Sequence, residues 1–278
     1  MILIVDSGST KTDWRLVKNN EENLSFETIG FNPYFIDSAS ILNELTGSKL
    51  AEIRKDVTQV FFYGAGCSSK DKCKVIFNPL NTFFCNARIE VEHDMLAAAR
   101  ATCGKEKGMV AILGTGSNSC LYNGHTITEN VAALGYLLGD NGSGADIGKT
   151  FIKAFLGKEL PSVVEQDFNE QYGLNITDIL DAVYKQALPN RFLAGFSLFV
   201  HQHLDNPSIV KMVEQRFDLF FEKNICNYSN YQDYPLHLVG SIAANYQPLI
   251  EKIAAKYSVK IGSVIKQPIK ELVKYHLS

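Results

Sequence analysis

The feature that most constrains the fold of this chain is a polar corner at residues 6–12, between two strand-like segments. Residues 1–5 (Met-Ile-Leu-Ile-Val) are typical of a buried strand, and residues 14–18 (Trp-Arg-Leu-Val-Lys) resemble a second strand in their alternation. The pattern therefore predicts a hairpin at the start of the chain. Its corner joins one carboxylate, Asp6, to several hydroxyls, and Gly8 permits a close backbone approach.

The hydroxyl and backbone N–H groups of this corner can bind a polyphosphate. The phosphate-binding residues predicted here are Gly8, Ser9, Thr10, Lys11 and Thr12. Asp6 would repel a phosphate directly, so we expect it to act through Mg²⁺ and its waters. A polar hairpin turn is the alternative, but ordinary turns are shorter and carry fewer hydroxyls. The corner is not a P-loop, because Lys11 follows a single glycine and leads into a strand.

Composition limits the classes of partner. The 278 residues are 46% apolar, enough for one or two domains with a large core. The net charge of −3 gives no electrostatic footprint for nucleic acid or an anionic membrane. No apolar run approaches the ~18 residues of a membrane span, and the N-terminus lacks a signal-peptide pattern. The six scattered cysteines form no C-x-x-C pair, so we expect reduced thiols and a cytoplasmic protein.

The opening pattern occurs a second time. After a polar break at residues 104–108, residues 109–113 form a strand-like run, residues 114–119 (Gly-Thr-Gly-Ser-Asn-Ser) a second corner, and residues 120–124 a returning strand. Two such copies indicate an internal duplication. We expect a first lobe of residues 1–106, joined by the final helix at 268–278, and a second lobe of residues 107–267.

Further candidate residues follow predicted strands. Asp94 lies between a strand at 87–91 and a helix from 95, where it could cap the helix or face a cleft. Asn32 precedes a proline at a strand end, so its amide could contact a ligand, or the segment could be a plain turn. A strand at 236–239 ends at Gly240 and Ser241. Helices are expected over residues 41–55, from Pro207 onward with an Asn206 cap, and over 269–276.

These junctions, in this order, resemble the sugar kinase/Hsp70/actin superfold. Residues 6–12 resemble its first phosphate motif, residues 114–117 the second, and residues 239–243 the adenosine motif. More narrowly, residues 114–119 together with 138–144 (Leu-Gly-Asp-Asn-Gly-Ser-Gly) are similar to the N-acetylglucosamine kinase family, which is grouped with the BadF/BadG-type ATPases. The resemblance implies an α/β, two-lobed, duplicated ribonuclease H-like fold with an ATP cleft between the lobes.

The resemblance also implies residue roles. Asp94 matches the catalytic base, and Thr10 and Thr115 match the threonines that face ATP. The substrate-binding residues implied for the sugar are Asn32, Ser117, Asn118 and Asp140. The remaining ATP-binding residues implied are Gly114, Gly116, Gly240 and Ser241. The implied cofactors are ATP and Mg²⁺, and the implied partner is a small sugar, with a homodimer as one candidate assembly.

The chain departs from the family at Asn141, where glutamate is usual, and at residues 145–146, where aromatics are frequent. The second change lies near the sugar pocket and leaves room for a bulkier amino sugar, such as one with a lactyl ether. The predicted reaction is phosphoryl transfer from ATP to a sugar hydroxyl, with Asp94 accepting the proton.

Three alternatives remain open. One is an activating ATPase of the BadF type, which holds an iron–sulfur cluster through cysteines, whereas no cysteine directly follows Gly144 here. The second is a nucleotide-dependent sugar sensor without turnover. The third is a pantothenate-type kinase on the same fold. The Ser117-Asn118 pair is more similar to the amino-sugar kinases than to this type.

Overall fold

The structure is a computed structural model that describes residues 1–19 and 21–278. The chain divides into two compact units. The first unit comprises Met1–Glu106 and Gln267–Ser278, and the second comprises Lys107–Lys266. Each unit contains its own five-stranded sheet, with helices packed on it.

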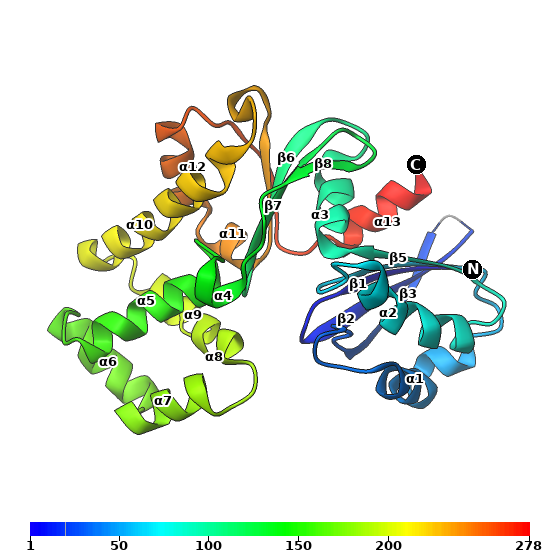
Figure 1. Ribbon diagram of the computed structural model, residues 1–278, viewed down its shortest axis with the longest axis horizontal. Coiled ribbons are helices and arrows are strands. Elements are labelled where there is room, and N and C mark those ends of the chain that lie inside the picture. The colour runs from blue at the N-terminus through cyan, green and yellow to red at the C-terminus, as the bar shows by residue number, and fades with distance from the viewer. Residues whose placement is uncertain (20) are drawn as a thin grey trace. The chain divides into compact units, whose positions relative to one another are not determined.

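The first unit contains both chain termini (Figure 1). Its strands are β1 (Ile2–Ser7), β2 (Lys11–Lys18), β3 (Glu21–Ile29), β4 (Gln59–Gly64) and β5 (Arg88–His93). Its helices are α1 (Ser38–Gly47), the 3₁₀ turn η1 (Lys49–Glu52), α2 (Lys70–Phe83), α3 (Asp94–Cys103) and α13 (Ile269–Leu277). The sheet order is β3-β2-β1-β4-β5. Strands β1, β2 and β3 are antiparallel neighbours, while β4 and β5 run parallel to β1.

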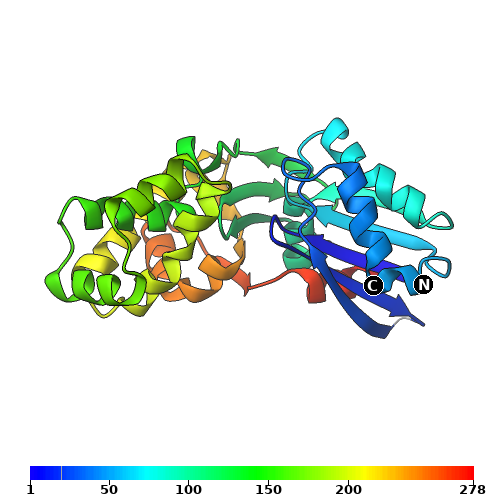
Figure 2. The ribbon, with the colours of Figure 1, turned by 90° about the horizontal axis from the view of Figure 1, so that it is seen from below.

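The first sheet is covered on both faces. Helices α1 and α2 lie on one face, where Val5 and Phe62 pack with Ile41 and Leu80 in an apolar core. Helices α3 and α13 pack together and against β1 on the other face (Figures 1 and 2). A strand covered on both faces is buried on both, which explains the continuous apolar run at the start of the sequence.

The second unit repeats this plan with more helices. Its strands are β6 (Gly108–Leu113), β7 (Ser117–Tyr122), β8 (Ile127–Asn130), β9 (Leu236–Val239) and β10 (Ile261–Ile265). Its helices are α4 (Gly135–Leu138), α5 (Gly144–Leu156), α6 (Ser162–Tyr172), α7 (Ile176–Tyr184), α8 (Pro189–Gly195), α9 (Ser197–Gln202), α10 (Pro207–Lys223), α11 (Ser241–Asn245) and α12 (Gln247–Lys256). Two 3₁₀ turns complete it, η2 (Ile225–Asn227) and η3 (Tyr231–Asp233).

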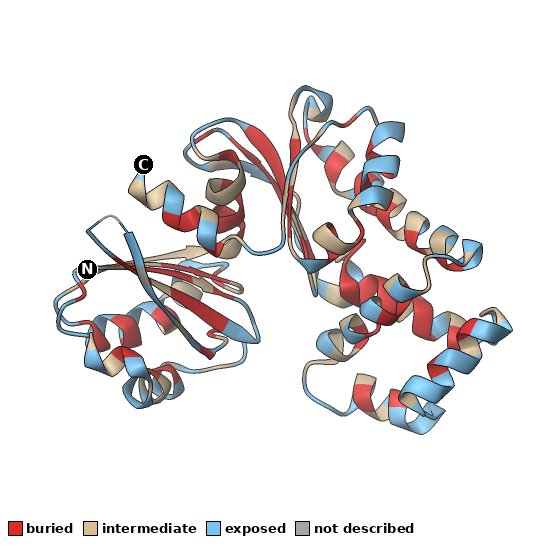
Figure 3. Ribbon diagram, turned by 180° about the vertical axis from the view of Figure 1, so that it is seen from behind, coloured by how far each residue is buried: buried red, intermediate tan, exposed pale blue. Residues whose placement is uncertain are grey.

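The strands of the second sheet lie in the order β10-β9-β6-β7-β8. From the other edge this order is β8-β7-β6-β9-β10, which matches β3-β2-β1-β4-β5 in the first unit strand for strand. The pairings agree too, because β6 is antiparallel to β7 and parallel to β9. The core of this unit joins the sheet to α5 and α10 through a cluster of phenylalanines, among them Phe151, Phe217 and Phe220. Figure 3 shows buried positions concentrated in the strands and in the helix faces packed on them. The predicted α/β fold with a duplicated unit is confirmed.

Element boundaries differ from the sequence-based expectations in several places. The helix expected at residues 41–55 is α1 from Ser38 to Gly47, followed by η1. Helix α2 was not predicted, because Pro79 lies inside it and prolines usually end helices. Helix α10 begins as predicted: Pro207 is its first residue, and the Asn206 side chain accepts a hydrogen bond from the Ser208 N–H.

Candidate active site

The carboxyl ends of β1, β4 and β5 meet at one edge of the first sheet, because the three strands are parallel. Asp6 on β1 pairs in register with Tyr63 on β4, and Tyr63 pairs with Glu92 on β5. Asp94 follows β5 as the first residue of α3. The topology therefore brings Asp6 and Asp94 to the same edge, where parallel α/β sheets commonly bind ligands.

Both carboxyls have raised pKa values. Burial raises the pKa of Asp6 to about 7, and the charges of Asp94 and Asp13 add to the rise while Lys11 opposes it. Burial raises the pKa of Asp94 to about 6, against the effect of hydrogen bonds from the backbone N–H groups of Met95 and of Asp94 itself. Each residue as a whole is half-buried, and the packed surroundings of its carboxyl disfavour the charged form. Neighbouring carboxyls with shifted pKa values are typical of functional sites.

Asp94 does not cap its helix. The N-cap of α3 is His93, whose Nδ1 accepts a hydrogen bond of 3.2 Å from the Leu96 N–H. The alternative in which Asp94 serves as the cap is therefore wrong. Asp94 is the first helical residue, where the helix dipole favours a negative charge, and its carboxylate accepts hydrogen bonds from the Met95 N–H and from its own N–H in the first turn.

A chain of hydroxyls fixes the corner after β1. The Phe31 N–H donates to Ser7 Oγ (3.0 Å), and the Thr12 hydroxyl donates to the Ile29 carbonyl oxygen (2.8 Å). Ser7 and Thr12 lie 2.8 Å apart, oxygen to oxygen, so Ser7 is the donor between them. Both are buried. The Thr12 hydroxyl is thus committed to the protein itself, which leaves its backbone as the part that could meet ATP.

The outer residues of the same corner have other surroundings. Ser9 and Thr10 are exposed. The Lys11 ammonium is ion-paired with Asp13 at 3.1 Å and with Glu27 at 2.8 Å. Ser9 and Thr10 are therefore exposed at this corner, whereas Lys11 is exposed but ion-paired.

Asn32 lies against this corner. Its amide nitrogen donates to Ser9 Oγ (2.7 Å), and its Oδ1 accepts from the Tyr34 N–H (3.0 Å). Two glycines that the sequence analysis did not assign to the site make this packing possible. A Cβ at Gly66, whose φ is +83°, would lie 2.4 Å from Asn32 Oδ1, and one at Gly30 would lie 2.4 Å from the Ser9 carbonyl carbon. Gly30 directly follows β3 and Gly66 lies two residues beyond the end of β4, and these positions near strand ends were the available signal.

The second unit contains an equivalent corner at residues 114–116, between β6 and β7. Helix α5 is fastened to it, because the Gly144 N–H donates to the Gly114 carbonyl (2.8 Å) and the Ala145 N–H to the Thr115 carbonyl (3.0 Å). Gly240 also packs on the corner: its φ is +123°, and a Cβ there would lie 2.2 Å from the Leu113 carbonyl oxygen. The predicted phosphate and adenosine motifs of this unit are thus in contact, with Ser241 opening α11 next to Gly240.

Asp140 joins the same group of residues. It has a left-handed backbone (φ 53°), and its carboxylate accepts a hydrogen bond from the Ser117 N–H. Burial raises its pKa. The carboxylate lies so close to Gly116 that a Cβ there would be 2.8 Å from Asp140 Oδ2. Among the described residues, the buried Ser117 hydroxyl has no hydrogen-bond partner, which fits a ligand hydroxyl.

Asn118 is less available than predicted. Its Oδ1 accepts hydrogen bonds from the Ser119 N–H (2.9 Å) and from the Asn130 amide on β8 (3.0 Å). Its amide nitrogen is the group left for a ligand. Asn141, where the family usually has glutamate, donates to the Asn224 side chain at 3.3 Å.

Nothing in residues 1–19 and 21–278 forms a metal site of three or more His, Cys, Asp or Glu side chains. Asp6 fits Mg²⁺ in another way. It is a carboxylate with a second carboxylate near it, and oxygen ligands of this kind suit a magnesium ion that keeps waters and substrate phosphates as its other ligands. Among the helices that the structure describes, none is both long and apolar enough to cross a membrane.

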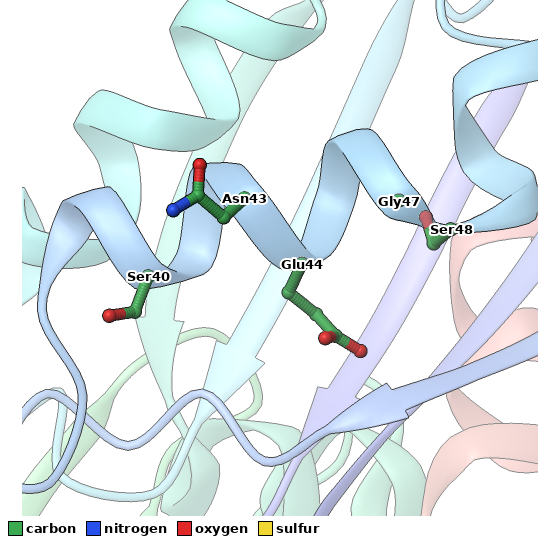
Figure 4. Close-up of a pocket in the computed structure, with 5 residues that line it drawn as sticks. All are labelled: Ser40, Asn43, Glu44, Gly47 and Ser48. Carbon is green, nitrogen blue, oxygen red and sulfur yellow. The ribbon is translucent and has the colours of Figure 1, made fainter.

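A hollow of about 450 Å³ lies elsewhere, along α1 (Figure 4). Its lining residues are Ser40, Asn43, Glu44, Gly47 and Ser48. No predicted site residue is among these, and Glu44 accepts a hydrogen bond from the Ile29 N–H. We assign it no role.

Comparison with known proteins finds no matching family model, but it does find similar solved structures and a curated relative. A solved structure of a candidate N-acetylglucosamine kinase from Porphyromonas gingivalis has a TM-score of 0.95 and 43% identity, covering 100% of this chain and 99% of that one. A second, from Chromobacterium violaceum, has a TM-score of 0.74 and 15% identity, covering 100% and 98%, and shares the fold. The N-acetylmuramic acid/N-acetylglucosamine kinase of Clostridium acetobutylicum is 23% identical over 158 residues, 55% of this chain.

The chain matches only about half of the length of that Clostridium relative, 52%. The Porphyromonas structure, by contrast, is matched over its whole length. The fold, with its two sheets of equal order, is that of a sugar kinase. Within that class, the chain belongs to the N-acetylglucosamine kinase family.

Proposed function

We propose that this protein is an ATP-dependent kinase that phosphorylates a hydroxyl of an N-acetylated amino sugar. The observation that carries the proposal is the position of Asp94, a carboxylate of raised pKa beside Asp6 at the carboxyl edge of the first sheet. The membership of the chain in the N-acetylglucosamine kinase family supports the substrate class.

Asp94 is the proposed catalytic base. With a pKa of about 6, its carboxyl is largely ionised at pH 7, yet it binds a proton more readily than an ordinary aspartate. A base poised near the working pH is the most effective at taking a proton from an attacking hydroxyl. Because phosphoryl transfer needs little covalent chemistry from the protein, the other residues position the substrates and stabilise charge.

The sugar contacts are proposed for Asn32, Ser117, Asn118 and Asp140. The unpartnered hydroxyl of Ser117 and the half-buried carboxylate of Asp140 can hydrogen-bond sugar hydroxyls. Polar sites of this kind discriminate strongly, because a wrong substrate leaves a buried group unpaired.

ATP is proposed to contact the corner after β1 and the corner after β6. In the corner after β1 the exposed hydroxyls of Ser9 and Thr10 meet phosphate, and in the second unit Gly114–Gly116 and Gly240 provide close backbone approach. Mg²⁺, when bound near Asp6, supplies positive charge that offsets the charge developing on the phosphates. A homodimeric assembly and a cytoplasmic location, where ATP is made, complete the proposal.

The test is a coupled assay of ADP release with ATP, Mg²⁺ and a panel of glucose, glucosamine, N-acetylglucosamine and N-acetylmuramic acid. We expect the acetylated sugars to give the highest kcat/KM, and mass spectrometry to show a sugar phosphate. A preference for glucose would contradict the substrate class. ADP release without a sugar phosphate would instead favour the activating ATPase.

A further inference from the structure

Lys72, in the first turn of α2, reaches over the backbone that carries Asn32. Its ammonium nitrogen donates a hydrogen bond to the Pro33 carbonyl oxygen at 3.1 Å. The same nitrogen lies 3.9 Å from the centre of the Tyr34 ring, a short cation–π contact. The cation is therefore held one to two residues along the chain from the amide proposed to bind sugar.

The segment beneath Lys72 is fixed from several sides. The Tyr34 N–H donates to Asn32 Oδ1 at 3.0 Å, and the Tyr34 hydroxyl is 3.0 Å from Ser68 Oγ in the loop before α2. Gly66, in the same loop, packs on both Asn32 and Tyr34. Lys72 is half-buried and Tyr34 is 58% exposed, so a ligand beside Asn32 can reach this corner from solvent.

The charge of Lys72 is not neutralised by an acidic side chain in the described part of the chain. The carboxylates nearest in sequence have other partners: Asp71 pairs with Lys74 at 3.1 Å, and Asp37 caps α1 through the Ser40 N–H. The carbonyl oxygen and the aromatic ring that Lys72 does contact are both uncharged. An ammonium has three N–H groups, so at least one can still donate to a further acceptor.

We propose that Lys72 binds a carboxylate carried by the sugar. The substrate class would then include N-acetylated amino sugars with an acidic substituent, such as the lactyl ether of N-acetylmuramic acid. This inference rests on the proposed function and extends it. A charge-assisted hydrogen bond from an ammonium to a carboxylate is roughly twice as strong as a neutral one. A neutral amino sugar lacks this contact and relies on the contacts to its hydroxyls alone.

The test compares four proteins on two sugars. The proteins are the wild type, Lys72→Met, Lys72→Arg and Lys74→Met, whose exposed, ion-paired lysine on the same helix provides the matched control. The sugars are N-acetylmuramic acid and neutral N-acetylglucosamine. We expect Lys72→Met to lower kcat/KM for the acidic sugar about ten- to hundredfold, mainly through KM, and to change that for the neutral sugar less than about threefold. Lys72→Arg should restore most of the loss, and Lys74→Met should change neither sugar.

A second measurement changes the sugar, so its main comparison uses the wild type alone. The methyl ester of N-acetylmuramic acid keeps the shape of the sugar and removes its charge. With the wild type, esterification should cause a loss similar to that of Lys72→Met, and with Lys72→Met it should cause almost none.

Equal losses for both sugars in Lys72→Met would overturn the inference, because Lys72 would then serve ATP or the corner in general. Phosphorylation of N-acetylglucosamine alone by the wild type would also overturn it while leaving the proposed kinase function intact. If neither sugar is phosphorylated, the proposed function itself fails.

Discussion

Asp6 and Asp94 interact across the edge of the first sheet: the charge of Asp94 is the largest cause, after burial, of the raised pKa of Asp6. Asp6 lies on β1 and Asp94 directly follows β5, with β4 between these two strands, so the parallel pairing of β1, β4 and β5 brings the two groups to one edge. The Asp6 carboxyl therefore titrates in the field of Asp94, and the pair provides the most direct tests of the proposed chemistry.

Replacing Asp94 with asparagine should abolish most turnover. The amide keeps the size of the side chain but cannot accept the proton of a sugar hydroxyl, so we expect kcat to fall about 10²- to 10⁴-fold with little change in the KM for sugar. Steady-state kinetics provide the measurement, with Asp71→Asn as a surface control. The fluorescence of Trp14, the single tryptophan and fully buried in the first unit, would report whether the variant is folded. A kcat within threefold of the wild type would exclude Asp94 as the base.

The pH profile should reflect the raised pKa of Asp94. A base must be deprotonated to act, so kcat/KM should rise with pH and level off above neutrality. The midpoint of the rise should lie near pH 6, since burial raises the pKa of Asp94 to about 6, and not near 3.9, the usual value for aspartate. An acid limb centred close to pH 4, measured at saturating Mg²⁺ and ATP, would contradict this assignment.

Much of the fold could be predicted from the sequence, because its signals are local. The strand, corner and strand at residues 1–18 and the matching run at 109–124 correspond to β1–β2 and β6–β7, and the equal sheet orders agree with the duplication inferred from them. Helix α2 was missed because its interior proline and low apolar content weaken the helical pattern. Its stability comes instead from Ile76, Leu80 and Phe83 in the core, which only tertiary packing reveals.

The candidate site was less predictable than the fold. A sequence shows which residues follow strands, but not which partners their side chains find. Thr10 and Thr12 look alike in the sequence, yet one is exposed and the other is buried in a hydroxyl chain. The contact of Lys72 with Pro33 and Tyr34 joins segments separated by nearly forty residues and has no local signature.

Removing the charge of Asp6 should stabilise the protein at neutral to alkaline pH. The pKa of Asp6 is about 7 in the folded chain and near 3.9 in an unfolded one, so ionisation above pH 4 costs folding free energy, and the cost is fully present above pH 7. Asp6→Asn avoids it. We expect the Tm of the variant to exceed that of the wild type at pH 8 and the difference to shrink toward zero near pH 4. Thermal unfolding followed by Trp14 fluorescence without Mg²⁺ or ATP would measure this, and a difference that grows toward acid pH would contradict it.

Replacing each threonine of the first corner by valine should have a different effect: Thr12→Val should lower stability, and Thr10→Val should weaken the use of ATP. Thr12→Val leaves the Ile29 carbonyl and the Ser7 hydroxyl without their buried partner, which should cost about 1–3 kcal/mol of unfolding free energy. Thr10→Val removes only an exposed hydroxyl, so stability should change little while the KM for ATP rises more than the KM for sugar. Urea unfolding and kinetics on both variants test the pair. If Thr10→Val affected both KM values equally, the phosphate role of Thr10 would be refuted.

Two substitutions of Asp140 should show whether its carboxylate binds the sugar or only holds the backbone of the loop. Its carboxylate accepts a hydrogen bond from the Ser117 N–H and faces the site beside Gly116, while its left-handed φ of 53° suits asparagine far better than alanine. Asp140→Ala loses the acceptor and strains the loop, so kcat/KM for the sugar should fall about ten- to a hundredfold. Asp140→Asn keeps the loop and an amide oxygen for Ser117, so its stability should match the wild type although it lacks the charge. A loss of sugar use in Asp140→Asn with unchanged Tm and unchanged KM for ATP would show that the carboxylate itself binds substrate, whereas normal kinetics in Asp140→Asn would limit Asp140 to holding the corner after β6.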